Sequence, residues 1–248
     1  MDAIAHDIVV GRYRAGERLP SVRDLAQAFG INPSTVQVVL GRLQTSGFVS
    51  GHPRLGFVVR DIEQLGGIAT WRYVFRFALE IPDRASKTCE DLLEMRRVLI
   101  AEAIQKIADH PSRFDASRVR RAVERVEVIA LATPEDVQEI ARAELAATRE
   151  LMLAVGQSVV TAVLNSIGEI YLDVPELLAA MYDDPQRHVG MWHLLLEGWE
   201  RRSLPASASE ETRKVLQRYD VAVVRRFREA LGTRSRRPPV RRPQFLSR

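Results

Sequence analysis

Two short amphipathic segments lie close together near the start of the chain. Each carries an apolar stripe at helical spacing: Leu25, Ala26 and Phe29 in the first, and Val36, Val39, Leu40 and Leu43 in the second. Ser21 and Asp24 form a capping box that starts the first helix, and Gly30 can adopt the left-handed conformation that ends it. Asn32 is an N-cap residue ahead of Pro33, which suits the first position of the second helix. The pattern predicts a helix-turn-helix.

Two β-like segments follow at residues 47–50 and 57–59, with a turn-rich basic loop at 51–56. A two-stranded ribbon after a helix-turn-helix is typical of a wing, from which His52 and Arg54 can reach a phosphate backbone or a minor groove. The second helix exposes small polar groups near its start, which suit phosphates and base edges in a major groove: Ser34, Thr35 and Gln37, beside Val38. The alternative is a helical hairpin and a β-hairpin with no DNA role.

From about Trp71 to Leu231 the apolar residues recur at helical spacing, and no alternating strand pattern is present. We expect six or seven amphipathic helices there, whose stripes form a bundle core. Prolines mark the expected breaks: Pro111, Pro134, Pro175, Pro185 and Pro205.

The segment around Gly66 and Gly67 reads as a boundary between two domains. We expect a winged helix-turn-helix domain at 1–62, a linker at 63–85, a helical domain at 86–232 and an Arg- and Pro-rich tail at 233–248. The tail has too little apolar content to fold, which predicts disorder.

Charge separates the same regions. Residues 1–62 carry seven arginines and five acidic residues, a net charge of +2, and residues 225–248 carry nine arginines and one acidic residue, a net charge of +8. Since the whole chain has a net charge of +4, residues 63–224 carry −6. Basic segments commonly meet phosphate or acidic surfaces, although a solvated face is the plainer interpretation.

Composition excludes several classes of protein. The chain has no long apolar window for a transmembrane helix, no secretory signal and a single cysteine, Cys89. We therefore expect a cytoplasmic protein without a membrane partner, a disulfide framework or a cysteine-based zinc site. Walker, GxSxG, HExxH and Rossmann motifs are also absent.

Many positions of residues 4–60 resemble the winged helix-turn-helix of GntR-type bacterial transcription regulators. The resemblance rests on the segments GRYRAGERLP, SVRDLA and GFV and on Thr35, Val36, Leu40 and Leu43. It implies that Arg23, the helix start at Pro33, Ser34, Thr35 and Gln37, and the wing residues His52 and Arg54 face DNA. Many members carry arginines where this chain has Pro33 and Gln37, so the resemblance implies DNA binding but does not extend to the operator sequence.

The helical region resembles the ligand-binding domain of the FadR subgroup of this family, an antiparallel bundle. The likeness rests on the stretches at 94–99, 144–157 and 164–193. It implies that Arg96 holds a carboxylate of an effector, in a cavity with four further candidates: Thr148, Tyr171, Trp192 and His193. The alternative for the aromatic residues is that they pack in the core. The alternative for Arg96 is that it lies on the surface.

Many members of the subgroup bind a metal through an Asp-x-x-x-His pair and two further histidines. By resemblance these positions fall on Glu144, Thr148, His193 and a residue near Tyr219 or Asp220. Histidine is missing from two of them, so we expect no high-affinity metal site and no cofactor.

The expected fold class is mostly α: an amino-terminal winged helix-turn-helix with a small β-wing, then an antiparallel bundle of six or seven helices. The expected function is sequence-specific regulation of transcription, by a homodimer on an inverted-repeat operator of double-stranded DNA. An organic acid, fatty acid or acyl-CoA in the bundle would modulate operator affinity. The alternatives are an effector-independent architectural DNA-binding protein and a helical-bundle enzyme using Asp183-Asp184 or Glu210-Glu211. We expect no enzyme.

Overall fold

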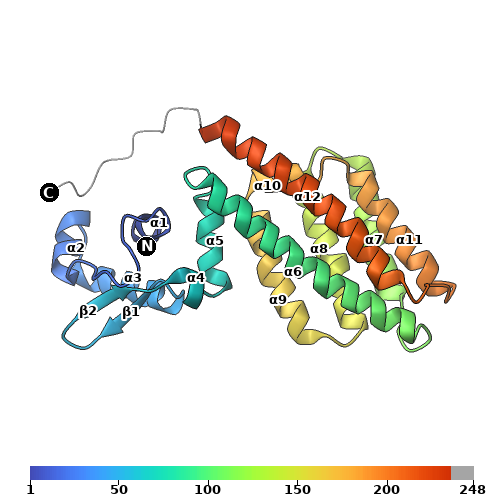
Figure 1. The fold of residues 1–248 in the computed structure, drawn as a ribbon, viewed down its shortest axis with the longest axis horizontal. Helices are drawn as coiled ribbons and strands as arrows, with labels where there is room; N and C mark the ends of the chain where they lie inside the picture. The colour runs from blue at the N-terminus through green and yellow to red at the C-terminus, as the bar shows by residue number, and fades with distance from the viewer. Residues whose placement is uncertain (236–248) are drawn as a thin grey trace. The chain divides into compact units, whose positions relative to one another are not determined.

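The computed structural model describes residues 1–235, so residues 236–248 of the expected tail lie outside the described part. The chain divides into two compact units (Figure 1). Met1–Ala85 and the described residues from Leu231 onward belong to the first unit, and Ser86–Ala230 forms the second.

The first unit combines short helices with one hairpin. Its elements are α1 (Asp2–Val9), α2 (Val22–Phe29), α3 (Pro33–Thr45), β1 (Val49–His52), β2 (Gly56–Val59), α4 (Ile62–Leu65) and α5 (Ile68–Arg76). The two strands pair antiparallel from Val49 opposite Val59 to His52 opposite Gly56. The inner faces of α2 and α3 pack with the start of β1 around Leu25, Leu40 and Phe48, which are almost fully buried.

The segment 63–85 differs from the expected linker. It forms most of α4, all of α5 and the start of α6, and Val74 and Phe77 are buried in the core of the first unit. Trp71 and Tyr73 pack against the same core. These apolar side chains at helical spacing extend the first unit to Ala85, because burying them against the neighbouring core removes their surface from water.

The second unit is a helical bundle. Its elements are α6 (Pro82–Asp109), α7 (Ser117–Ala132), α8 (Val137–Ala154), α9 (Ser158–Leu172), α10 (Pro175–Met181), α11 (Pro185–Glu200) and α12 (Ala208–Ser235). Pro175 and Pro185 start α10 and α11, where a missing N–H costs nothing. The long helices α6 and α12 run side by side (Figure 1), joined by an ion pair between Arg96 and Asp220.

The predicted fold class is confirmed: the described residues are mostly helical, with one two-stranded antiparallel sheet after the first three helices. The last helix continues to Ser235, three residues into the segment expected as a tail. Within residues 1–235 no helix is long and apolar enough to cross a membrane.

Candidate functional site

Capping residues fix the turn between α2 and α3. The hydroxyl of Ser21 accepts a hydrogen bond from the backbone N–H of Asp24 at 3.2 Å, and the Asp24 carboxylate accepts from the backbone N–H of Ser21 at 3.2 Å. Gly30 ends α2 in the left-handed conformation with φ of 63°. The side chain of Asn32 then accepts from the backbone N–H of Ser34 at 3.0 Å. The predicted helix-turn-helix is therefore present, and its capping interactions hold the start of α3.

The start of α3 presents polar side chains to solvent. Pro33 is its first residue, and Ser34, Thr35 and Gln37 are all exposed, whereas Val36 faces the core. The Ser34 hydroxyl donates to Asn32 Oδ1 at 2.9 Å. Gln37 makes no side-chain hydrogen bond within the described residues, so its amide is available to a partner.

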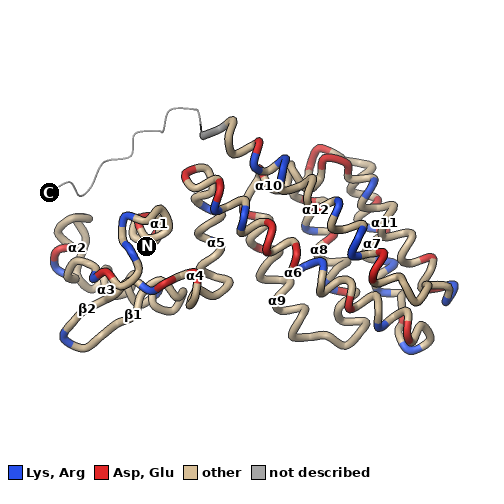
Figure 2. The backbone as a smooth tube through the Cα atoms, viewed as in Figure 1, with Lys and Arg blue, Asp and Glu red and all other residues tan. Residues whose placement is uncertain are grey.

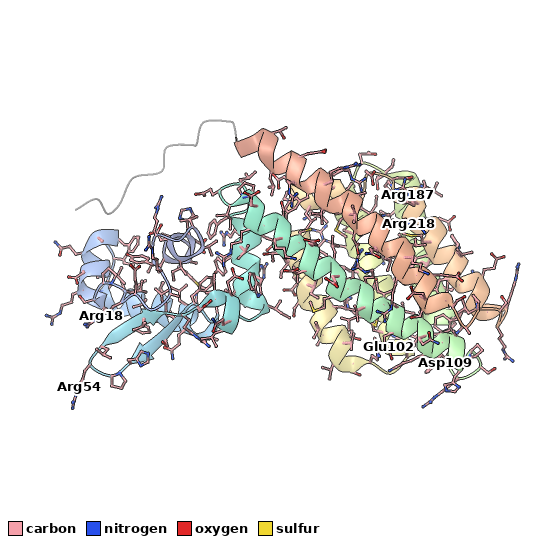
Figure 3. The ribbon with its side chains drawn as sticks, in the orientation of Figure 1. Arg18, Arg54, Glu102, Asp109, Arg187 and Arg218 are labelled. Atoms are coloured by element: carbon pink, nitrogen blue, oxygen red, sulfur yellow. The ribbon has the colours of Figure 1, made fainter. Side chains whose placement is uncertain are left out.

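The hairpin forms the predicted wing, although its strands are longer than expected at the tip. Arg54 lies at that tip with φ of 68° and points outward (Figure 3). His52 is exposed and shares a hydrogen bond with the Ser50 hydroxyl at 2.9 Å. The segment before α2 adds an edge to the wing: Leu19 N–H donates to the Phe57 carbonyl at 2.9 Å.

This added edge carries Arg18, which pairs with Val58 through an isolated β-bridge and has an exposed side chain. Sequence reasoning did not select Arg18, because nothing in its immediate neighbourhood marks a third wing strand. The signal available in the sequence was the alternation of the charged residue Arg18 with the apolar residue Leu19.

Several arginines of the first unit keep free positive charges. Arg18, Arg23, Arg42 and Arg54 are exposed, and none of these four has an ion-pair partner among residues 1–235. Figure 2 shows the basic position at the hairpin tip. By contrast Arg12 and Arg76 are neutralised locally, by Asp7 at 2.8 Å and Asp2 at 2.7 Å. Exposed guanidinium groups without internal partners suit phosphate oxygens.

The second unit contains a cavity of about 490 Å³. Six helices line it, α6 and α8 to α12, and most of its wall is apolar, including Ile104, Leu151, Leu164, Ile167, Leu178 and Leu195. Leu194 and Val215 also line it and are 73% and 45% exposed, so the cavity meets solvent between α11 and α12. Such a volume suits a small organic ligand with an apolar body.

One polar group of the cavity is centred on Glu144. Its carboxylate accepts hydrogen bonds from the Tyr182 hydroxyl at 2.6 Å, Trp192 Nε1 at 3.0 Å and His188 Nδ1 at 3.0 Å. Burial alone would raise the pKa of Glu144, but the charge of His188 and these three donors lower it to about 2. The Glu144 carboxylate is therefore ionised and fully engaged by the protein.

His188 is held as a cation by its partners. Nδ1 faces the Glu144 carboxylate and Nε2 faces the carbonyl of Met181 at 3.2 Å, and neither partner can donate a hydrogen bond. Only the doubly protonated ring donates from both nitrogens. Burial lowers the pKa of His188, but the charge of Glu144 outweighs it and the net direction is upward.

The other polar group joins α6 to α12. Arg96 and Arg97 both donate to the carboxylate of Asp220, and the Arg96 guanidinium lies 5.7 Å from the ring centre of Tyr219. Two cations on one anion leave a net charge of +1. Arg96 Nε and the Tyr171 hydroxyl are buried without a hydrogen-bond partner in the described structure. Both residues line the cavity, so they offer unused hydrogen-bonding capacity to a ligand.

Four of the five expected effector residues line this cavity: Arg96, Thr148, Tyr171 and Trp192. His193 does not. Its side chain is 40% exposed and pairs with Glu127 at 3.0 Å. The buried histidine on this helix is His188, which sequence reasoning missed together with Tyr182. The i,i+4 spacing of His188 and Trp192 was the available signal, because it places both on one face of α11, whereas His193 is turned by about 100° from Trp192.

The residues expected at metal-ligand positions are differently engaged. Thr148 follows Glu144 by one turn of α8, and His188 rather than His193 contacts Glu144. No group of three His, Cys, Asp or Glu side chains that could hold a metal ion is found in the described part of the chain. The first acid pair of the alternative enzyme hypothesis has structural partners: Asp183 binds Arg226 at 2.9 Å, and Asp184 caps α11.

The geometry of residues 1–59 defines a winged helix-turn-helix. The same residues match the family model described as bacterial regulatory proteins, gntR family. Over these residues the chain is therefore similar to the helix-turn-helix domain of that family.

A curated relative, the uncharacterised HTH-type transcriptional regulator YjiR of Escherichia coli (strain K12), is 45% identical over 56 residues. The match covers 23% of this chain and 12% of YjiR. Among solved structures, a Lar protein that "controls the expression of the Listeria monocytogenes agr system" is 17% identical, with 92% of this chain and 96% of that one covered at a TM-score of 0.49. For Streptococcus agalactiae GntR the identity is 14%, the coverage 90% and 96%, and the TM-score 0.42.

Proposed function

We propose that the protein is a transcription regulator that binds an inverted-repeat operator as a homodimer. The observation that carries this proposal is the gntR-family winged helix-turn-helix, with a solvent-exposed start of α3 and free arginines on α2, α3 and the wing. One helix-turn-helix reads only a half-site, and two-fold symmetry of the protein matches a palindromic operator.

In this proposal α3 enters the major groove with Ser34, Thr35 and Gln37 toward base edges and phosphates. Arg23 on α2 and Arg54 on the wing bind the backbone, since a guanidinium matches a phosphate bidentately. His52 lies beside Arg54 on the same hairpin and supports the wing contact.

Substitution of Arg23 tests the docking of this domain. An operator obtained by in vitro selection from random duplexes should bind Arg23→Ala more weakly by about 1–3 kcal/mol, with a shallower dependence on salt. Arg76→Ala is the matched control, because Arg76 is already paired with Asp2 and its loss should leave affinity unchanged. Equal affinity of Arg23→Ala and wild type would contradict the docking.

We further propose that the second unit is a FadR-type domain whose cavity binds an anionic, partly apolar effector such as an organic acid, a fatty acid or an acyl-CoA. The net positive charge of the Arg96–Arg97–Asp220 group, the unused Arg96 Nε and the unpartnered Tyr171 hydroxyl support this assignment. The apolar walls suit the remainder of the ligand. Thr148 and Trp192 complete the candidate set.

Effector binding is expected to change operator affinity, as a coupling free energy between two sites in one molecule. The cavity favours this function over that of an effector-independent architectural protein, which needs no cavity. We propose no catalytic role.

A thermal-shift screen of fatty acids, acyl-CoAs and small carboxylates tests the effector site. A ligand that binds only the folded protein raises its melting temperature. The shift should shrink most in Arg96→Ala, which removes both the net charge of the group and the contact with the ligand. It should shrink less in Arg97→Ala, because both arginines bind Asp220 but only Arg96 lines the cavity. If no anion shifts the melt, or both variants respond alike, the assignment of Arg96 is wrong.

A further inference from the structure

The outward face of α3 is unusual in its chemistry for a surface that meets DNA. Ser34, Val38, Gly41 and Thr45 follow one another at spacings of four, three and four residues, so they share one face of the helix. Leu40 and the other buried residues of α3 face the opposite way. Val38 is 57% exposed at the middle of this outward face.

No arginine or lysine lies in the first two turns of α3; its one basic residue, Arg42, comes near the carboxyl end. Guanine is most often read in the major groove by a bidentate Arg or Lys on O6 and N7. The amino-terminal turns of a recognition helix make the base contacts. The part of α3 that contacts bases is therefore poorly equipped for guanine.

The same turns are well equipped for adenine and thymine. The Gln37 amide is exposed and unbonded within residues 1–235, and a carboxamide matches adenine N6 and N7 bidentately. The isopropyl group of Val38 can contact only the apolar feature of the groove, which is the C5 methyl of thymine. The Ser34 hydroxyl already donates a hydrogen bond to Asn32 Oδ1, so it is less available to a base edge.

Gly41 allows close approach beside Val38. A Cβ at this position would meet nothing within 4 Å, so no internal neighbour requires a glycine. Glycine inside a helix is normally unfavourable because it loses the most backbone entropy. Its position on the outward face keeps the helix narrow where the groove would lie.

We infer that α3 reads A·T pairs at the core of each half-site, with Gln37 on an adenine and Val38 on the methyl group of a neighbouring thymine. The inference rests on the proposed DNA-binding function and adds which bases are recognised and by which side chains. Arg23, Arg18 and Arg54 contribute affinity through phosphates in this scheme, without selecting a base.

The experiment begins with operators selected by the wild-type homodimer from random duplexes. Within each half-site, thymines are replaced singly by uracil, which lacks only the methyl group, and adenines by 7-deazaadenine, which lacks N7. One uracil position should weaken binding about fourfold, as expected for one apolar carbon. One deazaadenine position should weaken it about tenfold.

Two variants act as controls for each other. Val38→Ala should lose most of the uracil penalty and keep the deazaadenine penalty, whereas Gln37→Ala should show the reverse. Both residues are exposed, so the fold should persist, which circular dichroism checks. Arg23→Ala should weaken binding to all these duplexes by the same factor and leave both penalties intact.

A selected half-site whose essential α3 contacts are G·C pairs would overturn the inference while leaving DNA binding established. Retention of both penalties by both variants would also overturn it. Failure of the wild type to enrich any sequence would instead refute the proposed function, and the inference with it.

Discussion

The two candidate sites of this protein are built in opposite ways. The face of α3 and the wing is a surface site, made from residues 18–54, with side chains that have few partners inside the molecule. The cavity of the second unit is an interior site, made from six helices between Arg96 and Tyr219, with most polar atoms already paired. A surface site tolerates substitution without loss of fold, whereas an interior site shares its residues with the core.

The largest effect is expected from Glu144→Ala. This change leaves the charge of His188 buried without its partner and removes the acceptor for Tyr182 and Trp192, which should cost about 3–5 kcal/mol of the stability of the second unit. Urea unfolding followed by tryptophan fluorescence measures it, while DNA binding by the first unit should survive under native conditions.

The matched control is Glu127→Ala. Glu127 also pairs with a histidine, but both side chains of that pair are about 40% exposed, so the change should cost less than about 1 kcal/mol. Equal losses of unfolding free energy in Glu144→Ala and Glu127→Ala would mean that burial does not make the Glu144–His188 pair more important to stability than the Glu127–His193 pair.

The second prediction concerns pH. The pKa of His188 is raised above its ordinary value of 6.5 in the folded state, so its contribution to stability is complete below pH 6.5 and is lost as pH rises through the raised pKa. One proton gives a slope of at most about 1.4 kcal/mol per pH unit. Unfolding free energies measured between pH 6 and pH 9 should show this decline.

The contribution of Glu144 to stability depends on pH in the opposite direction. Because the pKa of Glu144 is lowered in the folded state, this contribution is lost as pH falls from 4.5 toward 2. His188→Gln should abolish the alkaline decline, whereas His193→Gln should keep it, since His193 is on the surface. If stability still declines at alkaline pH in His188→Gln, the proton that is lost belongs to another group.

The contrast between the sites also explains what could be predicted from the sequence. The helix-turn-helix follows from contacts within a few residues: Ser21 with Asp24, Gly30 in its left-handed turn, Asn32 ahead of Pro33. Each carries its own local signal. The partners of Glu144 lie 38 to 48 residues away, and local spacing cannot select His188 over His193 without knowing how α11 is rotated against α8.

The segment 63–85 shows the same limit. Its glycines predicted a boundary, but Val74 and Phe77 find their apolar partners in the core of the first unit. Tertiary burial therefore decided the domain boundary, whereas local turn propensity indicated a linker.

A smaller effect is expected from Gly168→Ala in α9. A Cβ there would lie 2.4 Å from Leu145 Cδ2, so the Leu145 side chain must move. Leu145 lines the cavity and has space to move into it, which keeps the cost to about 1 kcal/mol, the low end for overpacking. The measurement is the melting temperature with and without an effector found by the thermal-shift screen. The effector-induced shift should fall, because Leu145 then occupies ligand volume.

The same substitution in α3 should have the opposite sign and the smallest size. Gly41→Ala places a methyl group in open space on an exposed helix face, where alanine is favoured over glycine by about 0.5–1 kcal/mol. The first unit should therefore become more stable in urea unfolding, while affinity for the selected operator falls because the added methyl group holds the helix away from the bases. A variant that is both more stable and equally tight in binding would show that α3 does not approach DNA along the face of Val38 and Gly41. A loss of stability would show that Gly41 serves the fold after all, and the distinction between a surface site and an interior site would fail at this position.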